Sequence, residues 1–379
     1  MKFEKLFEKP KFKNGIEINN RIVMAPMTHY SSNSDGTLNN DELKYIERRS
    51  NGPGMIVTAC AYVSKNGKGF EGEPSVEDDS MISQLSDWAN VIKKNGSKAI
   101  LQLHHGGRTC DPNSVINNEV VAPSNIPAVR EASGGVNPII PRELTNEEII
   151  DIIQDFAKAT KRAITAGFDG VEIHGANGYL LQQFYSPHAN RREDSWGGSR
   201  EKRLRFPMEV INEVKSTVEK YGEESFIIGY RFTPEEPEEP GLTMKDARVF
   251  AEKLSEKNLD YINILLNDYR SNGRKDVEIE KNRLKSLTNV IGNRTTVMSG
   301  GSIYTPEDAI DALNMGADLV TIGRELIIEP DWVQKVYENK YDDLITEMKF
   351  ENKTDLQIPE NLWNIIWSSP GWFPGVNTK

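Results

Sequence analysis

Eight short apolar runs, separated by longer amphipathic segments, constrain the fold of this chain more than any other feature of its sequence. Continuous apolar stretches of this kind are typical of parallel strands that are buried on both faces of a sheet. Eight strand–helix units predict an α/β fold, a closed TIM (β/α)8 barrel, although an open doubly wound sheet would show the same alternation. The expected strands are Ile22–Met27, Met55–Ala61, Ala99–His104, Gly170–His174, Phe226–Phe232, Tyr261–Leu265, Thr296–Ser299 and Leu319–Gly323.

Helical periodicity is clearest in three of the segments between these runs, Asn146–Ala166, Arg200–Tyr221 and Thr243–Lys257. In the first of them, Asn146 is a candidate N-cap, and acidic residues occupy the first turn, where they interact favourably with the helix dipole. These segments are expected to form the outer layer of the barrel.

Two connections, residues 105–145 and 175–199, are too long for plain strand-to-helix turns. Both follow expected strands, so we expect these long loops on the C-terminal face, where barrel enzymes hold their active sites. A third loop after a strand, 234–241 (PEEPEEPG), is acidic and rich in proline. We expect this loop to be stiff and solvated.

Composition excludes several classes of partner and location. Lys plus Arg number 46 and Asp plus Glu number 57, which gives a formal charge of −11 and argues against a nucleic-acid partner. No apolar run approaches the roughly 18 residues of a membrane span, and the N-terminal residues contain no apolar signal core. We therefore expect a cytoplasmic protein, whose only cysteines, Cys60 and Cys110, stay reduced and are too few for a four-cysteine cluster.

Polar side chains gather where the expected strands end. All five histidines lie at such ends or in the loop of residues 175–199, although any one of them could be an ordinary hydrogen-bonded structural residue; they are His29, His104, His105, His174 and His188. His174, Asn177 and Tyr179 form the sharpest cluster. An imidazole and an amide can donate hydrogen bonds to one carbonyl oxygen, and a nearby phenol can deliver a proton. A buried structural Tyr and Asn would give the same spacing.

Glycine-rich turns close the last two strands, in VMSGGSI (297–303) and TIGRELI (321–327). Such turns expose backbone N–H groups that can bind a phosphate, and Arg324 adds positive charge, although ordinary tight turns are the alternative. Gln102 and Arg231 lie inside expected strands, where a polar side chain needs a partner. For Arg231 there are two alternatives: an internal salt bridge, or a contact with a polar ring system above the barrel.

Several of these strings are similar to those of a known family. NRIVMAPMT (20–28), LQLHHGGR (101–108), DGVEIHGANGYLLQQF (169–184), NRREDSWGGSREKRLRFPMEV (190–210), VMSGG (297–301) and LVTIGR (319–324) carry the resemblance. The sequence resembles the old yellow enzyme family, NADH:flavin oxidoreductases that act as FMN-dependent ene-reductases, in its short single-domain form. The resemblance extends from about Phe7 to about Trp332.

The resemblance implies a role for each matched residue. The flavin would be lined by Pro26, Met27, Thr28 and Ala59, with Gln102 at its pyrimidine edge and Arg231 near N1. Its phosphate would be held by Ser299, Gly300, Gly301, Gly323 and Arg324. His174 and Asn177 would bind the activating oxygen of the substrate, Tyr179 would donate the proton, and Tyr30 would be a second substrate contact. No metal is implied.

The function implied is reduction of activated C=C bonds in enones, enals or nitroalkenes. NADH or NADPH would reduce FMN, whose N5 would pass hydride to the small electrophilic alkene while Tyr179 protonates the α-carbon. The histidines also leave a metal-dependent barrel hydrolase open, but His104 and His105 are adjacent and therefore point to opposite sides of a strand. A flavin-binding protein without catalysis is the remaining alternative, and the intact set of donors argues against it.

The C-terminal residues are less similar to the family. We expect an FMN-binding barrel over residues 1–340 and a C-terminal extension over residues 341–379. Trp363, Trp367, Trp372 and Phe373 make this extension so apolar that it must be covered. It would pack on its own barrel or, in a homo-oligomer, on a partner subunit.

Overall fold

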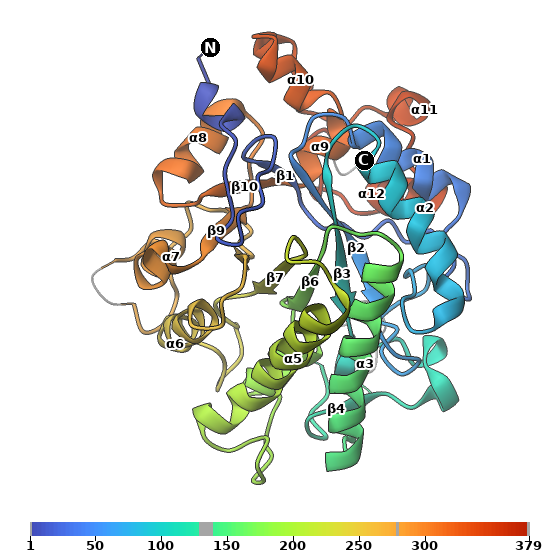
Figure 1. Cartoon of the computed structure of the whole chain (residues 1–379), viewed down its shortest axis with the longest axis vertical. Coiled ribbons are helices and arrows are strands. Elements are labelled where there is room, and N and C mark those ends of the chain that lie inside the picture. Colours follow the sequence, from blue (N-terminus) through green and yellow to red (C-terminus); the bar gives the residue numbers. More distant parts are fainter. Residues whose placement is uncertain (1, 129–138, 278–279, 377–379) are drawn as a thin grey trace.

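The computed structural model describes residues 2–128, 139–277 and 280–376, and its centre is a closed barrel of eight parallel strands (Figure 1). The strand order around the barrel is β1-β10-β9-β8-β7-β6-β3-β2, and β1 pairs with both β10 and β2. The predicted TIM barrel is therefore confirmed, and the open-sheet alternative is wrong. The barrel strands are β1 Ile22–Met24, β2 Met55–Tyr62, β3 Lys98–His104, β6 Gly170–Gly175, β7 Ile227–Phe232, β8 Tyr261–Ile264, β9 Thr296–Gly300 and β10 Leu319–Ile322.

Apolar side chains on both faces of the strands explain why these runs become strands. Val23, Val57, Ile100 and Met298 belong to one cluster inside the barrel, and the alternate residues belong to a larger cluster between the strands and the helices. Figure 1 shows the helices surrounding the barrel, with α3 and α5 side by side. The helices of the outer layer are α1 Asn40–Arg49, α2 Ile82–Lys93, α3 Asn146–Thr165, α5 Arg200–Tyr221, α6 Met244–Ser255, α7 Arg283–Ile291 and α8 Pro306–Asn314.

The N-terminus of α3 differs from the prediction by one residue. Thr145, rather than Asn146, is the N-cap, because its hydroxyl accepts the Glu148 N–H while the Glu148 carboxylate accepts the Thr145 N–H. Asn146 is the first helical residue, and its Oδ1 accepts a hydrogen bond of 2.8 Å from the Trp196 indole. The helix is thereby connected to the loop that follows β6.

Loops that follow the strands form the C-terminal face, as expected for 105–145 and 175–199. Within the first loop, β4 Val121–Ala122 pairs with β5 Arg142–Glu143, and the second contains the short helix α4 Leu180–Tyr185. Neither element was predicted, because two-residue strands and a six-residue helix leave almost no periodic signal. Together they support the loops from which candidate site residues project.

The acidic loop 234–241 is only partly solvated, which corrects the expectation. Glu235 and Glu236 are 7% and 6% exposed. Glu235 accepts the backbone N–H groups of Arg274 and Lys275, and Glu236 accepts hydrogen bonds from Gln182 and Ser186. Burial of these carboxylates is tolerated because donors from neighbouring loops surround them.

The C-terminal segment packs on the barrel of its own chain. It contains α11 Lys353–Leu356 and α12 Glu360–Ser368, after α9 Arg324–Ile328 and α10 Trp332–Tyr337. The buried Arg49 guanidinium donates to the carbonyls of Ile327 and Leu356, and the Asn361 amide donates to the Tyr30 carbonyl. In the described parts of the chain, no helix combines the length and apolar character needed to cross a membrane.

Candidate active site

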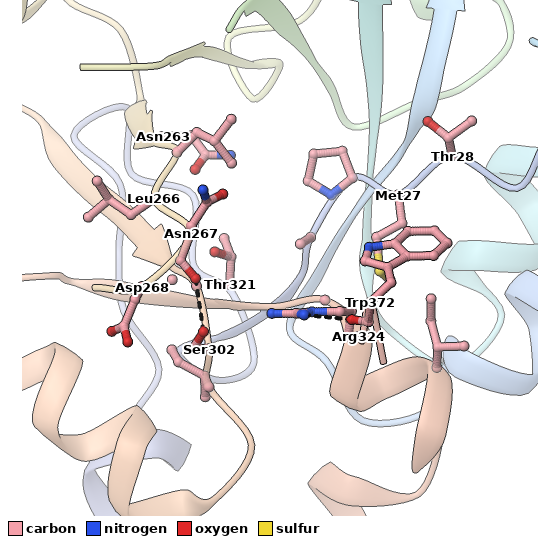
Figure 2. A pocket seen from close by; sticks show the side chains of 18 of the residues that line it. Met27, Thr28, Asn263, Leu266, Asn267, Asp268, Ser302, Thr321, Arg324 and Trp372 are labelled. Carbon is pink, nitrogen blue, oxygen red and sulfur yellow. Dashed lines mark hydrogen bonds between the residues drawn. The ribbon is translucent and has the colours of Figure 1, made fainter. Parts of the chain in front are cut away.

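A pocket with a volume of about 630 Å³ opens at the C-terminal ends of the barrel strands. Figure 2 shows its two walls, with Asn263, Leu266 and Asn267 on one side and Met27, Arg324 and Trp372 on the other. Nine of the residues predicted to bind the flavin or its substrate line this pocket: Pro26, Met27, Thr28, Tyr30, Arg231, Gly300, Gly301, Gly323 and Arg324. The structure therefore brings together residues that are widely separated in the sequence.

Three of the predicted flavin contacts do not line the pocket. Ser299 is fully buried, and its hydroxyl donates to the Ile264 carbonyl at 3.0 Å. Gln102 is buried among polar side chains of the barrel interior. Ala59 belongs to the apolar cluster between strands and helices, so its side chain does not face the barrel interior.

The residue next to Ala59 takes the inward position. An irregularity in β2 between Val57 and Cys60 puts Cys60 opposite Gln102. Cys60 is buried, and its pKa is raised well above the ordinary value by burial, an effect that a hydrogen bond with Thr28 partly opposes. Sequence reasoning missed Cys60 because a bulge that shifts the alternation of side chains leaves no mark in an apolar run.

Two glycines at the end of β9 permit a close approach of neighbouring backbone. A Cβ on Gly300 would lie 2.1 Å from the Thr321 carbonyl oxygen, and one on Gly301 would lie 2.2 Å from that of Leu266. Gly301 also has φ +109°, a conformation that other residues rarely adopt. No side chain at either position could enter this corner of the pocket without displacing backbone.

Arg324 borders the same corner and connects it to the C-terminal segment. Its guanidinium donates a hydrogen bond of 2.7 Å to the Trp372 carbonyl and lies 5.7 Å from the centre of the Tyr304 ring (Figure 2). The remaining N–H groups of the guanidinium are available to an anion, because the described residues place no carboxylate within ion-pair distance of it.

A buried polar cluster lies in the barrel beneath the pocket. Glu172 accepts hydrogen bonds from Gln102 at 2.7 Å and from Asn263 at 2.9 Å. Burial raises the pKa of Glu172, while nearby Arg231 lowers it. Among the described residues Arg231 forms no ion pair at contact distance, and its buried Nε has no hydrogen-bond partner. The internal salt bridge considered for Arg231 is therefore at most a longer-range interaction, and a donor remains free beside the pocket.

Three rings meet beside the pocket at the ends of β3 and β6. The Tyr179 ring lies 4.2 Å from that of His104 and 5.1 Å from that of His174, measured between ring centres. Burial raises the pKa of Tyr179 well above its usual value and lowers the pKa of His174 well below its own. The phenol thus keeps its proton and the imidazole is neutral over the ordinary pH range.

Asn177 lies apart from these rings. It is exposed, adopts φ 58°, and its backbone N–H donates to the Thr233 hydroxyl at 3.0 Å. Its side chain lines an adjoining groove rather than the main pocket.

The other histidines do not converge on the pocket as a group. His29 is buried between α1 and α2, with its Nδ1 2.7 Å from the Glu42 carboxylate, and His105 contacts Asn66 and the Gly107 N–H. His188 lies in the loop after α4, and burial lowers its pKa. His104 was not assigned a role, yet its Nδ1 lies 2.5 Å from the fully buried Glu73. This pair was invisible in the sequence because its members are 31 residues apart.

Comparison with known proteins decides between the flavin and metal interpretations. The family model described as "NADH:flavin oxidoreductase / NADH oxidase family" matches residues 5–343. The chain belongs to this family. The metal-dependent hydrolase is therefore wrong, and the family's dependence on FMN with NADH or NADPH applies to this chain.

Relatives of full length support the assignment to the flavin oxidoreductase family. The chain is 45% identical over 373 residues to the probable NADH-dependent flavin oxidoreductase YqiG of Bacillus subtilis (strain 168), covering 98% of both chains. An old yellow enzyme homologue from Zymomonas mobilis superimposes with a TM-score of 0.79 at 26% identity, over 95% of this chain and 99% of that one. Morphinone reductase in complex with tetrahydroNAD superimposes with a TM-score of 0.75 at 27% identity, over 88% of this chain and 90% of that one.

The pocket of this flavin oxidoreductase fits FMN by its own chemistry. Gly300, Gly301 and Arg324 leave a corner open to a phosphate, and the free Nε of Arg231 can donate to a polar ring edge. Arg231 also favours negative charge at that edge, and Glu172 below it is its largest favourable electrostatic influence.

We expect Arg324→Ala to weaken FMN binding about 10- to 100-fold, because one charged hydrogen bond to a phosphate contributes roughly 1.5–3 kcal/mol. Quenching of flavin fluorescence by the apoprotein measures the dissociation constant. Riboflavin, which lacks the phosphate, is the matched control, and its affinity should stay within about twofold. Equal losses for both flavins would show that Arg324 acts only through the C-terminal segment.

Proposed function

We propose that this protein uses NADH or NADPH to reduce activated C=C bonds of enones, enals or nitroalkenes. The observation that carries the proposal is the contact between a protonated phenol, Tyr179, and a neutral imidazole, His174, beside the flavin pocket. A hydrogen-bond donor and a proton donor on one side of a cavity suit a substrate that becomes negatively charged at oxygen and is protonated at carbon. The family and the named neighbours support the same chemistry.

The residues would divide the work as follows. When bound, FMN supplies the hydride that adds to the β-carbon of the alkene. His174 and Asn177 donate hydrogen bonds to the activating oxygen and stabilise the enolate that develops there. The phenol O–H of Tyr179 transfers its proton to the α-carbon, and Tyr30, whose ring packs at 5.1 Å on Phe70, limits the space above the substrate.

We also propose that residues 1–340 form the catalytic unit and residues 341–379 an extension that completes its pocket. Leu362, Trp372 and Phe373 belong to the pocket wall, which supports this division. In this arrangement the segment is needed for the shape of the site, in addition to covering its own apolar residues.

The test is a visible spectrum of the purified protein followed by anaerobic titration. We expect bound flavin to be bleached by NADH or NADPH and its colour to return when 2-cyclohexenone is added without oxygen. Cyclohexanone, which has the same ring and no C=C bond, is the control and should restore no colour. Flavin that stays yellow with both nucleotides would favour a binding protein without catalysis, and bleaching without recovery on several enones, enals and nitroalkenes would contradict the proposed substrate class.

A further inference from the structure

A second cavity of about 330 Å³ continues from the flavin pocket across the C-terminal face. The two share Leu265, Leu266 and Asn267, and Asn177 lines the second one. We call it the arginine groove, after the three arginines in its wall. The charged residues of its wall are Arg108, Arg274, Arg283, Glu235, Glu236 and Glu238.

The six charged groups of the arginine groove are not equivalent. Glu235 is paired with Arg283 at 2.7 Å and also accepts two backbone N–H groups, so its charge is internally compensated. Glu236 is buried, and this burial raises its pKa. Arg108 and Arg274 form no contact ion pair among the described residues, although Glu236 and Glu238 act favourably on Arg108 at longer range.

Arg108 is placed to bind an anion. Its Nη1 donates to the carbonyls of Ile126 and Pro127, which orients the guanidinium, while its buried Nε has no hydrogen-bond partner among the described residues. No carboxylate among the described residues lies within ion-pair distance of it, and burial lowers its pKa. A desolvated cation in a cavity wall, with an N–H that no described residue accepts, favours a ligand that carries negative charge.

Arg274 supplies a second cation on the opposite loop. Its backbone N–H is held by Glu235, but its exposed side chain has no ion-pair or hydrogen-bond partner among the described residues. The loop is therefore fixed while the guanidinium remains free to turn toward the cavity. Two guanidinium groups on facing loops suit a ligand with two adjacent phosphates better than a single carboxylate.

We propose that the arginine groove binds the pyrophosphate and adjoining ribose of the nicotinamide nucleotide, with Arg108 and Arg274 contacting the phosphates. The nicotinamide ring would reach the flavin pocket past Asn177. Such a subsite gives a protein of formal charge −11 a local attraction for an anionic reductant. This inference rests on the nicotinamide nucleotide being the reductant and does not depend on which alkene is reduced.

The test compares two reductants in Arg274→Glu. N-benzyl-1,4-dihydronicotinamide carries the reactive ring without phosphate or ribose, whereas NADH carries both. We expect kcat/KM for flavin reduction by NADH to fall about tenfold or more, and the loss with the benzyl compound to be at least fivefold smaller. Lys44→Glu, a charge reversal on α1 outside the groove, is the matched control and should change neither value by more than about twofold.

A binding measurement separates this subsite from the chemistry. Isothermal calorimetry should show ADP-ribose binding to the FMN-loaded wild type and to Lys44→Glu, with roughly tenfold weaker binding to Arg274→Glu and to Arg108→Gln. Equal loss with both reductants, or ADP-ribose binding that both substitutions leave unchanged, would overturn the proposal. Unchanged NADH kinetics with a raised KM for an alkene that bears a carboxylate would assign the groove to the substrate instead. None of these outcomes affects whether the enzyme reduces alkenes.

Discussion

Replacing Tyr179 with phenylalanine is expected to slow enone reduction by roughly 10²- to 10⁴-fold, the range that general acid catalysis contributes. Tyr179 is the proton donor that we propose, because burial raises the pKa of its phenol and lowers the pKa of the neighbouring His174, so that the phenol stays protonated and the imidazole neutral. Phenylalanine keeps the packing of the ring on His104 and removes only the O–H. Stopped-flow measurement of flavin reoxidation by 2-cyclohexenone gives the rate directly.

Two controls make this result specific. Reduction of the flavin by NADH needs no proton from Tyr179 and should stay within about threefold of wild type. Tyr185→Phe removes a buried hydroxyl from the same helix, one that donates to the Asp246 carbonyl on the far side from the pocket, and should leave reoxidation nearly unchanged. Reoxidation of Tyr179→Phe at the wild-type rate would show that the proton comes from another group or from water.

Glu172→Leu should destabilise the protein by about 1–3 kcal/mol, because it leaves buried polar groups without an acceptor and removes a charge that favours a buried guanidinium at longer range. Arg231 is buried, and Glu172 is the largest favourable electrostatic influence on it. The substitution also deprives the Gln102 and Asn263 amides of their acceptor. Urea unfolding of the apoprotein, followed by tryptophan fluorescence, measures the change in the free energy of unfolding.

The double variant Glu172→Leu/Arg231→Leu distinguishes an uncompensated Arg231 charge from poor packing of the new leucine as the cause of the lost stability. If an uncompensated charge produces the loss, the double variant should recover a large part of it, since both charged partners are then gone. Glu172→Gln, which keeps the shape and one acceptor, should be less harmful than leucine. A double variant less stable than Glu172→Leu would mean that Arg231 is stabilised by something other than this carboxylate.

The strands were predictable because their burial on both faces is a local requirement. All eight expected runs became barrel strands, and Arg200–Tyr221 agrees with the helix that forms. The N-cap of α3 is also predictable, since Thr145 and Glu148 have the spacing of a capping box. The prediction of Asn146 was wrong by one residue. The glycine-rich turns at the ends of β9 and β10 were identified because strand ends in a barrel meet on one face, whereas the pocket residues Pro26, Met27 and Thr28 after β1 were implied only by the family resemblance.

Contacts across the barrel could not be predicted from the sequence in the same way. Glu172 meets Gln102 and Asn263 from different strands, and Glu73 meets His104 from a loop, so each contact depends on the register of neighbouring elements. The bulge in β2 similarly makes Cys60, and not Ala59, the residue that faces inward. The burial of Glu235 and Glu236 depends on donors from two other connections, those that follow β6 and β8.

The amino-acid sequence alone established the alternation of strands and helices and the face on which polar groups collect, because hydrophobic burial acts on each segment separately. Closure of the barrel then selected which polar groups became partners and which, such as the Nε atoms of Arg108 and Arg231, have no hydrogen-bond partner among the described residues. The physical reason is that hydrogen bonds and charges act only over a few ångströms, so their partners are known only when distant segments have been brought together.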